Sequence, residues 1–159
     1  VFEAQSAEPD IMNRPPRDRN EPIIKADMLW EIVLSGVGIL LASFLPYKYL
    51  LSNGMGTPLA RSFALATMLL GNILLVTSME SNFQPFYKQD PNPARLWVNS
   101  FTILAMAIIL YVPFAQRLFQ TGPLSLKQLI QAAALAGVAT LWRELVKWRR
   151  RRKLVGENV

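Results

Sequence analysis

Few side chains in this chain are suited to catalysis, and two reactive kinds are absent. The 159 residues include no cysteine and no histidine. Thiolate nucleophiles, disulfides, histidine-ligated zinc and serine–histidine–aspartate hydrolysis are therefore excluded. Any chemistry would have to rest on carboxylates, lysines or hydroxyls, and the sequence predicts no catalytic residue, no metal site and no cofactor on this chain.

Asn72 is the one strongly polar residue in the interior of a long apolar segment, residues 59–79. An amide in such a segment can hydrogen-bond to a neighbouring helix, which stabilises a membrane bundle by roughly 0.6 kcal/mol on average. It can also contact an ion, directly or through another group. Glu31 and Glu80 lie at the ends of apolar segments, where a carboxylate can reach water. Both roles of Asn72 remain open at this point.

Two groups of basic residues are candidates for docking. Arg14 and Arg17 flank Pro15 and Pro16, and adjacent prolines fix φ near −65°, which holds the two arginines at a set spacing. The second group is Arg149, Arg150, Arg151, Arg152 and Lys153. Each such residue beside an anionic leaflet contributes about 1 kcal/mol of attraction. We expect the second group to anchor the chain at a membrane surface, with lipid and not nucleic acid as its partner.

The elements that position these residues are long and apolar. Hydrophobic residues make up 52% of the chain and charged residues 18%, which is more apolar and less charged than an ordinary soluble domain. A helix needs about 20 apolar residues to cross a bilayer core about 30 Å thick. Four segments approach or exceed that length: 29–51, 59–79, 96–114 and 124–142. The sequence predicts an all-α membrane protein with four transmembrane helices in an antiparallel bundle.

Three regions follow from this pattern. Residues 1–27 form a proline-rich cytoplasmic loop, residues 28–148 the four-helix membrane domain, and residues 149–159 a basic cytoplasmic tail. Pro46 is expected to kink or end the first span. Pro113 is expected to mark the exit of the third span, with a short loop over residues 116–123.

Charge predicts the orientation of the four spans. With both termini on one side, that side carries 13 of the 17 lysines and arginines, and the other side carries 4. The positive-inside rule then places both termini in the cytoplasm. Together with the four apolar segments, this asymmetry predicts an integral membrane protein with both termini in the cytoplasm.

The N-terminal segment carries a specific motif, EPDIMNRPPR at residues 8–17, followed by Glu21-Pro22-Ile23. It resembles the cytoplasmic loop between the sixth and seventh membrane helices of type II P-type cation ATPases, above all the calcium-pump branch. Pro91-Asn92-Pro93 and the segment around Trp142 look like the bacterial members. The resemblance extends from about Phe2 to Lys147.

The resemblance implies that this chain is the C-terminal membrane subdomain, the last four of ten helices, of a pump in a bacterial plasma membrane. It would support the ion-binding helices and couple them to the cytoplasmic phosphorylation domain through Arg14, Pro15, Pro16 and Arg17. Its partners would be the remaining helices and the cytoplasmic domains. The parent pump would use ATP and Mg²⁺, whereas this chain lacks the family's phosphorylated D-K-T-G motif and would not act alone. The alternative is a free-standing four-helix membrane protein with a structural or regulatory role toward a partner.

The resemblance also implies a comparison at Asn72. Two-calcium pumps have a carboxylate ligand one turn before an asparagine on the eighth membrane helix. If Asn72 matches that asparagine, Leu69 or Leu70 stands at the position of the carboxylate. Leucine cannot coordinate a hard cation, which takes oxygen ligands. This departure favours a pump with a single ion site, or one for another cation.

Overall fold

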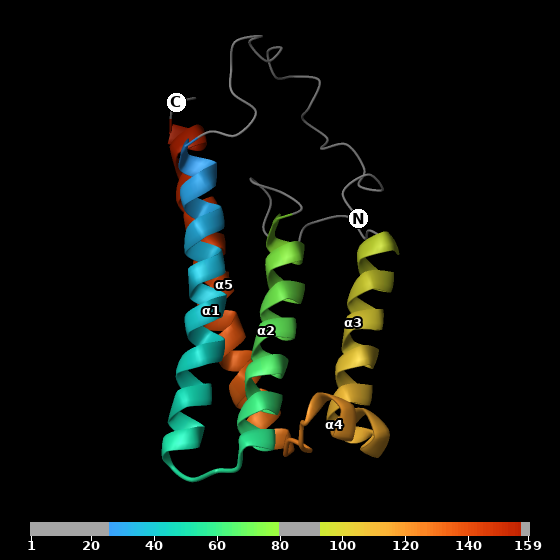
Figure 1. Cartoon of the computed structure of the whole chain (residues 1–159). Coiled ribbons are helices and arrows are strands. Elements are labelled where there is room, and N and C mark those ends of the chain that lie inside the picture. The colour runs from blue at the N-terminus through green and yellow to red at the C-terminus, as the bar shows by residue number, and fades with distance from the viewer. Residues whose placement is uncertain (1–25, 80–92, 157–159) are drawn as a thin grey trace.

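The computed structural model describes residues 26–79 and 93–156, with side chains placed for residues 29–78, 93–140 and Trp142. The described residues form five helices and no strand (Figure 1). The helices are α1 (Ala26–Ser52), α2 (Thr57–Met79), α3 (Pro93–Tyr111), α4 (Pro113–Phe119) and α5 (Leu126–Gly156). The predicted all-α fold is confirmed over these ranges.

The four long helices alternate in direction. In Figure 1 the start of α1, the end of α2, the start of α3 and the end of α5 lie toward one end of the molecule. At the other end lie the α1–α2 turn, the short helix α4 and the start of α5; we call this the hairpin end. Helix α2 packs against α5, α1 and α3, and it therefore occupies the centre of the arrangement.

Three helices are long and apolar enough to cross a membrane. The candidate spans are Leu29–Ser52, Thr57–Ser78 and Pro93–Tyr111. The predicted fourth span, residues 124–142, falls mostly within α5, which does not reach the same hydropathy over its described residues. Lys127 and Gln128, both in its first turn, and Gln131 one turn later lower its apolar character. Three of the four predicted spans are thus supported as membrane helices.

Pro46 is predicted to kink or to end the first span. An end is excluded, because α1 continues through Pro46 to Ser52, close to the predicted end of that span at residue 51. Proline removes one helical hydrogen bond, yet membrane helices tolerate this loss where neighbouring helices and hydroxyl groups satisfy the freed backbone.

The prediction of a simple loop after the third span also requires correction. Pro113 begins a further helix, α4, that extends to Phe119. Proline favours the first helical position because its φ is already helical and its missing N–H is not needed there. Val112 before it is extended, as residues before proline prefer. Gln120 then ends α4 in the left-handed region, with φ 53°.

Small residues dominate the contact between α2 and α5. Ala66 and Thr67 of α2 and Ala132 and Thr140 of α5 are fully buried. Small side chains let membrane helices approach closely, so that packing replaces the hydrophobic driving force that is absent in lipid. The buried hydroxyls bond within their own helix: Thr67 donates to the carbonyl oxygen of Phe63 and Thr140 to that of Ala136, each at 2.8 Å. No polar cost therefore opposes the close approach.

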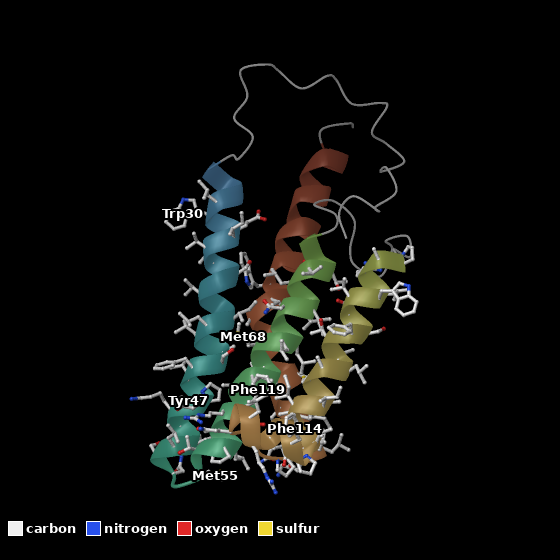
Figure 2. The ribbon with its side chains drawn as sticks, turned by 45° about the vertical axis from the view of Figure 1, so that its right-hand side comes forward. Trp30, Tyr47, Met55, Met68, Phe114 and Phe119 are labelled. Atoms are coloured by element: carbon white, nitrogen blue, oxygen red, sulfur yellow. The ribbon has the colours of Figure 1, made fainter. Side chains whose placement is uncertain are left out.

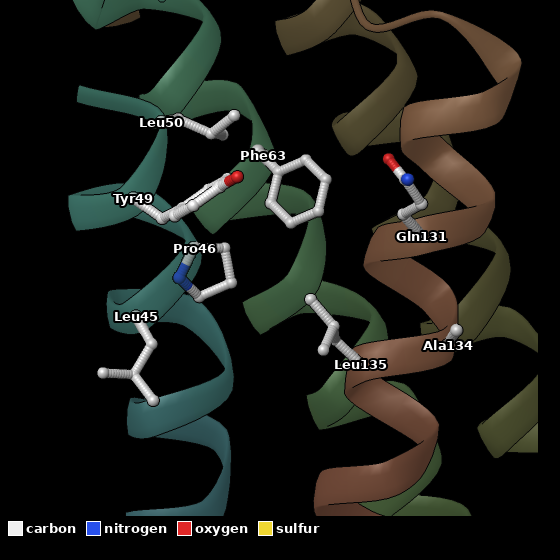
Figure 3. A pocket seen from close by; sticks show the side chains of 8 residues that line it. All are labelled: Leu45, Pro46, Tyr49, Leu50, Phe63, Gln131, Ala134 and Leu135. Atoms are coloured by element: carbon white, nitrogen blue, oxygen red, sulfur yellow. The ribbon is translucent and has the colours of Figure 1, made fainter. Parts of the chain in front are cut away.

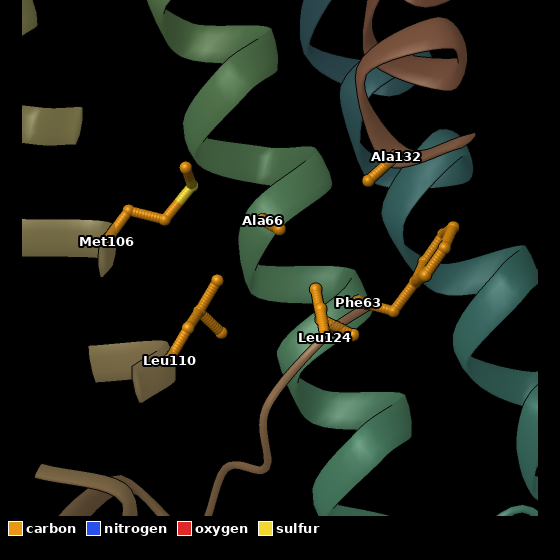
Figure 4. Packing of buried hydrophobic residues seen from close by; sticks show 6 residues of the cluster. All are labelled: Phe63, Ala66, Met106, Leu110, Leu124 and Ala132. Atoms are coloured by element: carbon orange, nitrogen blue, oxygen red, sulfur yellow. The ribbon is translucent and has the colours of Figure 1, made fainter. Parts of the chain in front are cut away.

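Larger side chains fill the space around this contact (Figure 4). Met106 and Leu110 reach it from α3, and Phe63 reaches it from α2. Leu124, just before α5, is 4% exposed and joins the same cluster. The core thus unites α2, α3 and α5 near the hairpin end.

Hydrogen bonds fix the linker between α4 and α5 to the start of α2. The Ser62 hydroxyl accepts from the Gly122 N–H at 2.8 Å and lies 2.7 Å from the Gly122 carbonyl oxygen. Tyr111 donates to the carbonyl oxygen of Leu124 at 2.9 Å, and Thr121 donates to that of Ile109 at 2.8 Å. These bonds set where α5 begins, relative to both α2 and α3.

Two glycines lie where α1 comes close to its neighbours. A Cβ atom on Gly38 would lie 3.0 Å from the backbone carbonyl oxygen of Ala139 on α5. A Cβ atom on Gly71 of α2 would lie 3.3 Å from Ile39 of α1. Gly36, two residues before Gly38, has open space at the same position.

We predict that Gly38→Ala destabilises the packing of α1 on α5. The new methyl group would press on a backbone oxygen, which cannot rotate away, and overpacking of this kind costs about 1–3 kcal/mol. Unfolding of the purified chain in mixed micelles, followed by circular dichroism, measures the change. Gly36→Ala is the matched control and should leave stability unchanged or raise it, because alanine favours the helix. Equal stability of the two variants would contradict the proposed close contact.

Candidate functional site on the uncovered face of α2

Helix α2 has one packed face and one uncovered face. On the packed face, Ala60, Ser62 and Ala66 are fully buried. The uncovered face contains Met68 and Asn72, one helical turn apart. Arg61 and Leu65 follow the same side of the helix toward its start, where Arg61 donates to the side-chain oxygen of Gln120 and Leu65 packs against the core cluster. Arg61, Met68 and Asn72 are exposed and Leu65 is half-buried. Met68, labelled in Figure 2, is 53% exposed.

Asn72 lies on this uncovered face and not between the described helices. Its side chain is exposed, and it forms no hydrogen bond to α1, α3 or α5 over the described residues. Within the described residues, Asn72 therefore does not link these helices by a hydrogen bond. Its amide is available to a partner that covers the uncovered face.

The leucines that precede Asn72 have a packing role. Leu69 and Leu70 are half-buried and pack against the core cluster. Over the described residues, no group of three or more acidic, cysteine or histidine side chains is placed to hold a metal ion. Leu69, Leu70 and Asn72 by themselves therefore do not make a cation site.

Glu31 lies at the start of α1, at the end of the molecule opposite the hairpin end. The side chain is half-buried, and its backbone carbonyl oxygen accepts from the Ser35 hydroxyl at 2.6 Å. This position agrees with the predicted placement of Glu31 near the end of a span, where a carboxylate can reach water.

Other predicted site residues fall outside what the structure describes. Arg14, Pro15, Pro16, Arg17 and Glu80 lie beyond the described residues. The basic group, from Arg149 to Lys153, lies on the continuous backbone of α5, which extends to Gly156. These basic residues are therefore part of a helix.

The uncovered face itself was not predicted from the sequence, although a signal for it exists. Small residues of α2 recur on the packed side, at Ala60, Ser62, Ala66, Thr67 and Gly71. A stripe of small residues indicates the side on which a membrane helix meets its neighbours. The opposite side, with Asn72, is then the one left for other contacts.

Comparison with known proteins gives a family. The family model "Cation transporting ATPase, C-terminus" matches residues 1–149. "Calcium-transporting ATPase 1" of Schizosaccharomyces pombe is 26% identical over 152 residues, which cover 94% of this chain and 17% of the relative. The protein of the same name from Yarrowia lipolytica is 25% identical over 146 residues, 91% of this chain and 16% of the relative.

A mammalian relative is more distant. "Calcium-transporting ATPase type 2C member 2" of Mus musculus is 23% identical over 141 residues, 87% of this chain and 15% of the relative. The chain thus spans about one sixth of the length of each of these relatives. The match over residues 1–149, together with apolar helices arranged around α2, shows that the chain belongs to the family of cation-transporting ATPase C-terminal domains.

Proposed function

We propose that this chain is the membrane subdomain of an ATP-driven cation pump of the calcium-transporting kind, and that it supports the ion-binding helices of that pump. The match to the C-terminal family over residues 1–149 is the observation that carries the proposal. ATP hydrolysis, with its Mg²⁺, belongs to other parts of the parent pump. This chain contributes packing, membrane anchoring and coupling.

The uncovered face of α2 supports contact with further helices of the pump. The relatives are about six times longer than the matched region, so other segments are available to cover Met68 and Asn72. An amide oxygen is a suitable ligand for Ca²⁺, which takes six to eight oxygens. Asn72 would supply one of these oxygens, and the rest would come from outside this chain. Leucine at positions 69 and 70 favours a single ion site.

We also propose that α5 crosses the membrane as a fourth span, with both termini in the cytoplasm. Its 31 residues correspond to about 46 Å at 1.5 Å per residue, longer than a bilayer core about 30 Å thick. The polar side chains of its first turns can extend toward the headgroups, and the basic group at its end would lie at the cytoplasmic surface. A bacterial plasma membrane remains a prediction that rests on the motifs around residues 91–93 and 142–147, since the relatives compared above are fungal and rodent proteins.

We expect single cysteines at the hairpin end to react with an impermeant maleimide added outside intact cells. Asn53→Cys and Leu118→Cys are suitable because both positions are exposed and the chain has no cysteine of its own. Gln89→Cys and Glu157→Cys should react only after permeabilisation. If Glu157→Cys reacted from outside, α5 would not cross the membrane.

Asn72→Leu in the full-length pump should lower the apparent calcium affinity about tenfold, the order of loss expected for a group that supports a metal site. Expression should be unchanged because Asn72 has no partner among the described helices. Calcium-dependent ⁴⁵Ca uptake into membrane vesicles measures the affinity. Ser100→Ala is the control, since Ser100 is an exposed polar residue on α3. Parental affinity in Asn72→Leu would exclude an ion contact.

The double substitution Arg14→Ala with Arg17→Ala should slow phosphoenzyme turnover in the full-length pump. The two cations flank rigid prolines and would dock on the phosphorylation domain, and no apolar span is altered. Phosphoenzyme decay after a chase with unlabelled ATP, together with the amount of protein in the membrane, separates coupling from insertion. A decay rate equal to that of the parental pump would show that the arginines only set orientation.

A further inference from the structure

An apolar groove opens between α1, α2 and α5 near the hairpin end. Its volume is about 580 Å³, and its walls include Leu45, Pro46 and Tyr49 of α1, Phe63 of α2, and Gln131 and Leu135 of α5. Figure 3 shows the α1 side chains on one wall and the α5 side chains on the other, with Phe63 between them. Pro46 and Ala134 are the smallest side chains of this lining.

One polar side chain interrupts the apolar lining. Gln131 is exposed, and no hydrogen bond is recorded for its amide within the part of the chain that the structure describes. Lys127 lies four residues earlier on α5 and is therefore on the same helical face, one turn closer to the hairpin end. Lys127 is also exposed. The lining of the groove is thus apolar apart from the amide of Gln131, and a cation lies one helical turn beyond that amide.

The charge of the hairpin end is entirely positive. The sequence has no aspartate or glutamate between residues 32 and 79 or between residues 91 and 143. The same stretches place Lys48, Arg61, Arg117 and Lys127 at the hairpin end. Lys127 also lies in the first turn of α5, where the helix dipole is positive and no acidic residue offsets it. An anionic group at the mouth of the groove would be attracted both by these cations and by the positive end of the α5 helix dipole.

We propose that the groove binds an anionic phospholipid. One acyl chain would lie against Leu45, Phe63 and Leu135, and the phosphate would face Lys127 and the amide of Gln131. The apolar lining favours the acyl chain of the lipid, and the cation at the mouth of the groove attracts the negatively charged headgroup. The inference depends on the membrane location of the helices and not on the proposed pump activity.

A photoactivatable phosphatidylglycerol, with a diazirine in its acyl chain, tests this assignment. The full 159-residue chain is reconstituted in phosphatidylcholine vesicles that contain the probe and is irradiated, and the labelled peptides are mapped by mass spectrometry. We expect adducts on α1 and α5 around residues 45–50 and 131–135. Unlabelled phosphatidylglycerol should compete better than unlabelled phosphatidylcholine.

Variants separate a specific site from general surface charge. Lys127→Gln should reduce labelling about fivefold, the effect of one cation beside an anionic lipid. Neither lysine lines the groove itself, but Lys127 lies one turn from Gln131 on the same face of α5. Lys48→Gln removes a cation of α1 from the same end of the molecule and should have little effect. Ala134→Phe should block the groove and reduce labelling while the lysines remain; Ala134 is exposed, so the fold should tolerate the larger side chain.

Three results would overturn the proposal. Equal competition by phosphatidylcholine would mean that the groove accepts any apolar occupant, such as another helix. Equal losses in Lys127→Gln and Lys48→Gln would mean that only the overall charge of this end matters. Adducts confined to residues outside the groove, or full labelling of Ala134→Phe, would place the lipid elsewhere.

Discussion

Close approach of helix backbones is the constraint on which the rest of this structure depends. Lipid tails are as apolar as leucine, so helices in a membrane gain little from burying large apolar side chains against one another. Small residues at the crossings remove this difficulty. A Cβ atom on Gly38 would lie only 3.0 Å from a carbonyl oxygen of α5, so the absence of a side chain there allows the two helices to come close. Ala66, Ala132 and Ala136 are buried in the same way along α2 and α5. The central place of α2 follows from these contacts.

Polar groups are accommodated without opposing this packing. The buried hydroxyls of Thr67 and Thr140 bond to carbonyls in the preceding turn of their own helices, so they add no unsatisfied group to an apolar core. At the hairpin end, the hydroxyl of Ser62 instead joins α2 to the backbone of Gly122, 60 residues away in the sequence. That contact turns a connecting segment into a fixed support for α5.

Acidic and basic residues are distributed differently along the chain. All 11 carboxylates lie outside residues 32–79 and 91–143, and over the described residues the hairpin end carries only cations. Over the described residues, no cluster of acidic side chains is available for a metal ion. This distribution of charge and the exposed amide of Asn72 agree with a chain that does not form a complete cation site from its described residues.

The sequence by itself determined the helical class, the three most apolar spans and the family, because apolar segments of about 20 residues and the motif at residues 8–17 are local signals. The choice between a kink and an end at Pro46, the helix α4 after Pro113 and the position of Asn72 were decided only by the tertiary structure. A proline in an apolar segment either breaks or merely bends a helix, depending on which neighbours satisfy the freed backbone. Likewise, an asparagine in a span faces a neighbour or an open surface according to which side of the helix the small residues occupy. The groove between α1, α2 and α5 is likewise a tertiary feature, since the residues that line it come from three helices and range from Leu45 to Leu135 in the sequence.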